Sequence, residues 1–139
     1  MSSTQFHSPI YQIFDEAFNQ GNLDIVDKLL APDYSTHNAF GRVPNGPQGL
    51  KCLIAMLRNA FPDFRCTLED EIQQGDKLAA HWTMRGTHTG LFMGNPPTGR
   101  AVEAQGVIFA RTENDRIVED WTLVDEMGIL QQLGLIPPS

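Results

Sequence analysis

The chain has 139 residues, 41% of them hydrophobic and 19% charged, a composition typical of one folded domain rather than of a disordered chain. Its net charge of −7 comes without a basic cluster, which argues against nucleic-acid and membrane-surface partners. It contains no apolar run of about 18 residues, the length of a membrane span. We therefore expect a single cytoplasmic domain over residues 1–139, with no nucleic acid and no membrane as partner.

Helical periodicity dominates the first half of the chain. After Ser8-Pro9, a capping residue followed by a favoured first helical residue, apolar side chains recur every three or four positions. This spacing predicts a helix over residues 8–21. The same pattern predicts a shorter helix over 23–30 and a third over 47–61, with a short strand over 34–38 between them.

After residue 63 the hydrophobic period changes from 3.6 to 2, the spacing of strands with one face in water. This pattern predicts strands over residues 64–72, 77–87, 101–111 and 116–125. A Gly- and Pro-rich loop over 90–99 separates the middle strands, and a helical turn over 128–133 closes the chain. Helices followed by antiparallel strands indicate the α+β class, with helices on one face of the sheet and an apolar hollow between them.

Six short motifs follow one another over residues 61–134. They are Phe61-Pro62-Asp63, Gly75-Asp76-Lys77-Leu78-Ala79, Arg85-Gly86-Thr87-His88-Thr89-Gly90, Pro97-Thr98-Gly99-Arg100, Ile117-Val118-Glu119-Asp120-Trp121 with Asp125, and Gln132-Leu133-Gly134. As an ordered set they resemble the SnoaL-like polyketide cyclase family, which belongs to the nuclear-transport-factor-like α+β cone superfamily. The resemblance implies a curved antiparallel sheet wrapped around the N-terminal helices, forming a cone with an internal pocket.

Members of this family that act on polyketides close a ring by intramolecular aldol condensation. The resemblance therefore implies a polyketide cyclase-like enzyme that performs cofactor-free acid–base chemistry on a hydrophobic carbonyl substrate. Three alternatives fit the same fold: an epoxide hydrolase, a ketosteroid-isomerase-like enzyme, and a non-catalytic small-molecule binding or dimerisation module. The chain lacks the Arg-x-Asp sequence of the hydrolase branch, which argues against the first of these.

The resemblance places the family's catalytic aspartate and histidine at Thr122 and Ile108, so the known catalytic pair is absent from this chain. A catalytic base would have to lie at another position. Asp125 shares one strand face with Trp121, since side chains alternate between the two faces of a strand. If that face lines the hollow, the loss of hydration raises the pKa of Asp125 and makes it a general base. Two alternatives stay open: Asp125 caps the following helical turn, or the opposite face lines the hollow and Asp120 becomes the candidate.

A second group of candidates lies on the strand over 77–87. His81, Thr83 and Arg85 alternate on one face of that strand, and we expect this face to line the pocket. His81 stands where we expect the family to have an arginine. It is the predicted catalytic partner of Asp125, orienting a carboxylate or polarising a substrate carbonyl. A structural histidine is the alternative.

Four further residues complete the predicted pocket. His37 resembles a family pocket position, and Trp121 and Phe14 are the aromatic side chains most expected to contact a flat ligand. His88 is included as well, with organisation of the 90–99 loop as its alternative role. We expect no metal, because the chain's histidines show no ligand spacing.

The expected partners are a hydrophobic small-molecule substrate and a second copy of the chain. A homodimer is expected because apolar residues such as Val107 and Phe109 fall on the outer face of the predicted sheet and need covering.

Overall fold

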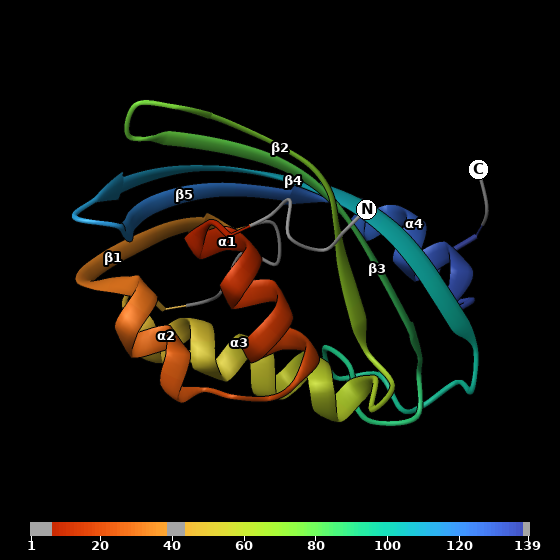
Figure 1. Ribbon diagram of the computed structural model, residues 1–139. Helices are drawn as coiled ribbons and strands as arrows, with labels where there is room; N and C mark the ends of the chain where they lie inside the picture. The colour runs from red at the N-terminus through yellow and green to blue at the C-terminus, as the bar shows by residue number, and fades with distance from the viewer. Residues whose placement is uncertain (1–6, 39–43, 138–139) are drawn as a thin grey trace.

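In the computed structural model, which describes residues 7–38 and 44–137, the N-terminal helices lie under the concave face of a curved β-sheet (Figure 1). They are α1 (Pro9–Gln12), which continues into the π-helix η2 (Ile13–Asn19), α2 (Asp24–Leu29) and α3 (Pro47–Ala60). As the sequence predicts, Ser8 begins the first helix, and its Oγ accepts the Tyr11 N–H at 3.1 Å. Within the described residues, none of the helices has the length and apolar character needed to cross a membrane.

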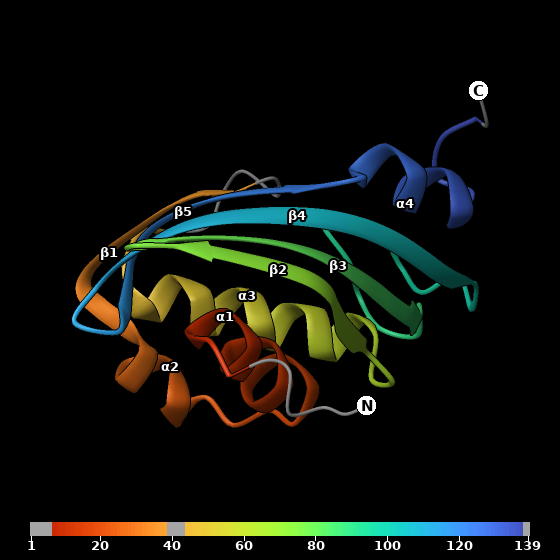
Figure 2. The same ribbon diagram turned by 45° about the horizontal axis from the view of Figure 1, so that its top comes forward.

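In the described residues the sheet has five strands, in the order β1-β5-β4-β3-β2. They are β1 (Leu30–Asn38), β2 (Arg65–Gln74), β3 (Lys77–Thr87), β4 (Ala101–Glu113) and β5 (Arg116–Val124). Figure 2 shows the long strands arching over the helices, with α4 (Glu126–Gln132) beyond the end of β5. The predicted α+β class with a curved sheet is confirmed. One departure is that β1 pairs parallel with β5, since these strands are joined through α3 and the other strands rather than by a hairpin.

The second helix is shorter, and the first strand longer, than the sequence pattern predicts. β1 begins at Leu30 and includes Pro32, whereas the pattern predicts a helix up to residue 30 and a strand from residue 34. A proline has no N–H to donate, and it is tolerated here because β1 is an edge strand. The register of β1 against β5 shifts between Leu30 and Ser35, the stretch that contains this proline.

Alternating burial separates the two faces of the sheet. On β4 every second residue from 102 to 110 is buried, and on β3 the inner face includes Trp82 and Met84. These side chains pack with the apolar stripes of η2 and α3 into one core. The outer face leaves several large apolar side chains exposed: Ile72, Val107, Phe109, Trp121 and Leu123. The side chains that shape an internal site must therefore come from the inner face.

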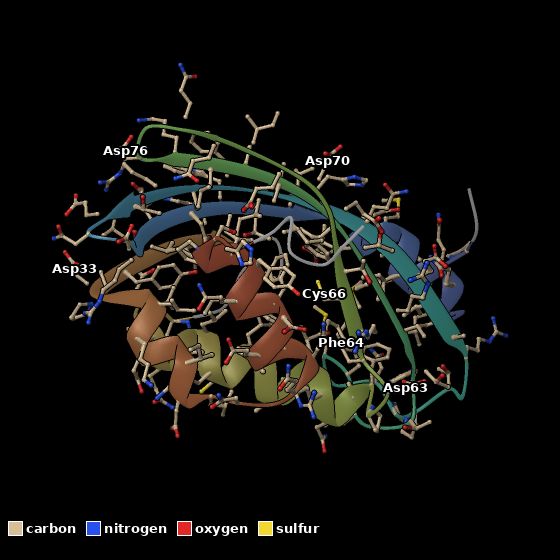
Figure 3. All side chains as sticks on the ribbon, viewed as in Figure 1. Asp33, Asp63, Phe64, Cys66, Asp70 and Asp76 are labelled. Atoms are coloured by element: carbon tan, nitrogen blue, oxygen red, sulfur yellow. The ribbon has the colours of Figure 1, made fainter. Side chains whose placement is uncertain are left out.

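Two side-chain amides attach helices to strands. Asn19, at the end of η2, donates from Nδ2 to the Cys66 carbonyl at 2.8 Å and accepts the Cys66 N–H at Oδ1 at 2.7 Å. Gln132 of α4 makes the same pair of hydrogen bonds with the backbone of Glu103 on β4, at 2.9 and 2.8 Å. Each amide takes the place of a neighbouring strand. Figure 3 shows Cys66 on β2, close to the N-terminal helices that this contact holds against the sheet.

Candidate active site

An internal cavity of about 70 Å³ lies between the helices and the concave face of the sheet. Its wall is mostly apolar and draws on α1, η2, α3 and all five strands. The polar residues of the wall gather where β1 and β5 lie side by side: Tyr34, Thr36, Asp120 and Thr122. An apolar hollow with a few converging polar groups is the usual form of a small-molecule site.

Asp120 is the one ionisable carboxyl in the described wall of this cavity. It points inward because β5 alternates, with Asp120 and Thr122 on the inner face and Trp121 on the outer face. The Asp120 side chain is 4% exposed. Its Oδ2 accepts the Tyr34 hydroxyl at 2.6 Å, and its Oδ1 accepts the Thr36 hydroxyl at 2.6 Å. The Thr122 hydroxyl adds a longer contact to Oδ1 at 3.4 Å.

Burial sets the acidity of this group. The loss of hydration raises the pKa of the Asp120 carboxyl, and the hydrogen bonds from Thr36, Tyr34 and Thr122 offset part of that rise. Burial and the Asp120 charge raise the pKa of Tyr34 as well, so the phenol keeps its proton and remains a donor. In the described part of the chain, no Lys, Arg or His makes a salt bridge with Asp120. A carboxylate held only by hydroxyl groups in an apolar cavity is suited to accept a proton.

The cavity wall offers neither a reactive thiol nor a metal site. Cys66 contributes to the wall, but burial raises the pKa of its thiol, which therefore stays protonated. Within residues 7–38 and 44–137, no group of three His, Cys, Asp or Glu side chains is placed to hold a metal ion. Asp120 with its hydroxyl partners is therefore the candidate catalytic group.

Comparison with known proteins shows the family of this chain. The family model described as "SnoaL-like polyketide cyclase" matches residues 8–133. This chain belongs to the SnoaL-like polyketide cyclase family. The chain is 30% identical over 120 residues to the nogalonic acid methyl ester cyclase of Streptomyces nogalater, covering 85% of this chain and 90% of that protein. It is 27% identical over 122 residues to the aklanonic acid methyl ester cyclase DnrD of Streptomyces peucetius, covering 86% of this chain and 84% of that protein.

Solved structures show the same SnoaL-like fold. The crystal structure of wild-type IdmH from Streptomyces antibioticus superposes with a TM-score of 0.79 at 36% identity, covering 92% of this chain and 99% of that one. TsrD from Streptomyces laurentii superposes with a TM-score of 0.82 at 25% identity, covering 98% of this chain and 99% of that one. The SnoaL-like cone therefore extends over nearly the whole chain.

The two positions that the sequence resemblance assigns to the family's catalytic pair do face the cavity. Ile108 and Thr122 are cross-strand partners on β4 and β5, and both contribute to the cavity wall. Neither side chain is able to act as a base. Asp120 lies two residues before Thr122 on the same face of β5. This chain therefore has a carboxylate one inward-facing position away from the one that the resemblance assigns to the family's aspartate.

Asp125 lies outside the cavity wall, which differs from the prediction that it is the catalytic base. It caps α4, and its Oδ1 accepts the Gly128 N–H at 3.0 Å. A side chain at Gly128 would crowd this contact, because an added Cβ would lie 2.3 Å from Asp125 Oδ2. Asp125 therefore has the capping role that the sequence analysis left open, and Asp120 occupies the cavity-facing position.

His81, Thr83 and Arg85 share one face of β3 as predicted, but that face is the outer one. His81 Nε2 contacts Gln105 Oε1 at 2.6 Å, and Arg85 pairs with Glu103 at 3.2 Å. Thr83 is buried, but it is not part of the cavity wall. The inner face of β3 carries Trp82 and Met84 instead, because large apolar side chains are the ones that cover the helices.

The four other predicted pocket residues lie in three different parts of the structure. Phe14 of η2 lines the cavity. His37 and Trp121 lie on the outer face, stacked with ring centroids 5.0 Å apart, and His37 pairs with Glu119 at 3.0 Å. His88 is fully buried outside the cavity wall, where its Nδ1 accepts the Thr98 N–H at 3.2 Å and organises the following loop.

Tyr34 and Thr36 are functional candidates that sequence reasoning missed. The available signal was the period of two in the first strand, which places an aromatic residue and a hydroxyl residue on one face. What the sequence does not show is the parallel pairing that sets Thr36 opposite Asp120, a residue 84 positions later in the chain.

Proposed function

We propose that this protein is a cofactor-free polyketide cyclase in which Asp120 is the general acid–base. The observation that carries the proposal is a buried carboxylate in the wall of an apolar cavity, held by two hydroxyl groups at 2.6 Å. The relatives from Streptomyces nogalater and Streptomyces peucetius are named for polyketide methyl esters. We infer a substrate of that class: a neutral, hydrophobic ester with several carbonyl groups.

The proposed reaction is an intramolecular aldol addition. The Asp120 carboxylate takes a proton from a carbon beside a carbonyl group, and the C–H electron pair becomes an enolate. The enolate carbon attacks a second carbonyl carbon, forming a C–C bond while that carbonyl's π pair moves to its oxygen. The resulting alkoxide takes the proton from the Asp120 carboxylic acid, which regenerates the carboxylate. Atoms and electrons balance within the substrate, so no oxidant, reductant or cofactor is consumed.

Tyr34 and Thr36 support this cycle by holding the carboxylate in place. Both hydroxyls donate to Asp120, one to each oxygen, and the strands that carry these three residues, β1 and β5, pair with each other in the sheet. Donors that stabilise the carboxylate also limit the rise of its pKa, so the group is ionised over a wider pH range.

Substrate binding requires the cavity to widen. Its volume of about 70 Å³ is below the roughly 300 Å³ of a site for a drug-sized molecule. Phe14 and Phe18 of η2 form part of the wall. We expect their rings to change rotamer when a fused-ring ligand enters.

The test is turnover of nogalonic acid methyl ester and aklanonic acid methyl ester by the purified protein. Aldol addition leaves the mass unchanged, so the product is identified by a new chromatographic retention time at the same mass, and by the loss of one carbonyl carbon signal in its NMR spectrum. Heat-inactivated protein is the control for spontaneous closure. Binding of both esters without any product would contradict the proposal and favour a non-catalytic binding protein.

We also propose that a second copy of the chain covers the outer face of the sheet. Val107, Phe109 and Trp121 remain exposed there at 48%, 41% and 40%, and they line one open groove. A contiguous apolar face of this kind is typical of a protein interface. Sedimentation of Phe109→Asp beside the parent tests this, with Leu91→Asp, at an exposed loop residue, as the matched control. A monomeric parent, or a Phe109→Asp variant that sediments like the parent dimer, would contradict the proposal.

A further inference from the structure

Trp82 carries a buried hydrogen-bond donor without a partner. The residue is 6% exposed and belongs to the cavity wall. Among the described residues, its indole Nε1 is one of two buried side-chain nitrogen or oxygen atoms that have no hydrogen-bond partner. The other is His88 Nε2, which lies outside the cavity wall. Buried donors are normally satisfied, so an unpaired donor on a residue of the cavity wall points to a missing acceptor.

The position of the indole is fixed by its neighbours. Gly106 lies opposite Trp82 on β4, and an added Cβ there would lie 2.2 Å from Trp82 Cζ2. The absence of a side chain at Gly106 therefore leaves the space that the indole occupies. The Phe14 ring contacts the indole edge to face, with centroids 5.8 Å apart and planes at 73°. A donor held in this way is preorganised for a ligand.

The other strong donors in the described wall are already engaged. The hydroxyls of Tyr34, Thr36 and Thr122 all donate to Asp120, and Cys66 offers only a weak S–H donor. Among the described wall residues, the Trp82 N–H is therefore the strong donor that has no partner.

Trp82 and Asp120 lie at different ends of the site. Asp120 pairs with Ala110 on β4, whereas Trp82 pairs with Gly106, four residues away on that strand. The two backbone positions are thus about 14 Å apart along the strands and about 10 Å apart across them. The indole is therefore placed to contact a part of the substrate remote from the carbon that Asp120 deprotonates.

We propose that the Trp82 Nε1–H donates a hydrogen bond to a carbonyl oxygen on a substrate ring remote from the reacting carbon. This inference rests on the proposed function, because it uses the same cavity. It narrows the substrate class to elongated fused-ring compounds with a second carbonyl acceptor on a different ring. A contact remote from the reaction binds substrate and transition state equally, so its loss raises KM and leaves kcat within about twofold.

The experiment follows the two indole N–H signals of protein labelled with ¹⁵N-tryptophan, since the chain has only Trp82 and Trp121. The Trp121→Phe variant assigns them. The probes are 1-indanone and indane, which share a bicyclic shape but differ in one carbonyl oxygen. We expect 1-indanone to move the Trp82 N–H signal downfield. We expect indane to leave that signal close to its position in the ligand-free protein. We also expect Trp82→Phe to reduce the ratio of the affinity for 1-indanone to the affinity for indane about five- to tenfold, the usual effect of one neutral hydrogen bond.

Three results would overturn the inference. They are a Trp82 signal that does not move when the ketone saturates the protein, equal movement with indane, and failure of the ketone to bind. The signal is measured in the parent protein, so the test stands even if Trp82→Phe does not fold. The Asp120→Asn variant separates this inference from the proposed function: it is expected to lose turnover while the ketone still moves the Trp82 signal.

Discussion

Tyr34 and Asp120 lie on adjacent parallel strands, and the Tyr34 phenol donates to Asp120 Oδ2 at 2.6 Å inside the cavity wall. This contact orients the carboxylate and stabilises its charged form. Tyr34→Phe removes the donor, so the pKa of Asp120 is expected to rise further. The acid limb of the pH profile of kcat/KM should then move to higher pH, with the largest loss of activity on the acid side. Thr36→Val removes the donor to Oδ1 and should move the acid limb in the same direction. An acid limb that stays in place in both variants would contradict the proposed role of these two hydroxyls.

Titration of Asp120 also predicts a pH-dependent stability. Burial raises its pKa in the folded state, so between the unfolded and folded pKa values the folded protein binds more protons than the unfolded chain. The contribution of Asp120 is therefore fully present below about pH 4 and is lost as the pH rises through the folded pKa. In Asp120→Asn this contribution is absent.

The measurement for that prediction is the melting temperature of the parent and of Asp120→Asn at pH 4, 5.5 and 7.5. The parent should lose stability relative to the variant as the pH rises. A difference that stays constant over this range would show that Asp120 titrates alike in the folded and unfolded chain.

The charge of the cavity wall predicts a preference for esters over free acids. Asp120 is the acidic residue in the described wall, and that wall contains no Lys, Arg or His. A substrate carboxylate would lose hydration without gaining a cation, beside a like charge. We expect the methyl ester to bind about a hundredfold more tightly than the free acid at pH 7.5, a difference of about 2.7 kcal/mol.

Calorimetry with each ester and its free acid measures this preference. Asp120→Asn should narrow it, because the repelling charge is removed while the apolar wall remains. Equal affinity of the parent for ester and acid would contradict the assignment of a neutral substrate.

The position of Asp125 predicts an effect on stability rather than on chemistry. Its Oδ1 caps α4 through the Gly128 N–H at 3.0 Å. Asp125→Ala removes the cap and should reduce the free energy of unfolding by about 1 kcal/mol. Denaturant unfolding measures this change, and Asp125→Asn is the control because asparagine caps helices about as well. A loss of stability in the asparagine variant equal to that in the alanine variant would argue against a capping role.

The sequence predicts the order and type of the elements well, because periods of 3.6 and 2 are local properties. It predicts less well which face of each strand points inward. On β3 the face with His81 looked like a pocket face, yet Trp82 and Met84 turn toward the helices and leave His81 outside. On β5 the same question decides between Asp120 and Asp125, and alternation alone leaves both faces possible.

The parts that sequence reasoning missed depend on contacts between distant segments. Tyr34 meets Asp120 across 86 positions of the chain because β1 joins the sheet parallel to β5. The unpaired N–H of Trp82 is visible only once its neighbours are placed. The roles proposed for Tyr34 and Trp82 therefore depend on neighbours that only the fold brings close to them.

The most direct test of Asp120 as the general acid–base compares kcat for Asp120→Asn and Asp125→Asn with the polyketide ester that the parent cyclises. Both substitutions are nearly isosteric and remove one negative charge, but only Asp120 lies in the cavity wall. We predict a loss of about a hundredfold or more in Asp120→Asn, the usual scale for general acid–base catalysis, and a rate within about twofold of the parent in Asp125→Asn. Full activity in a folded Asp120→Asn variant, or the large loss in Asp125→Asn instead, would contradict it.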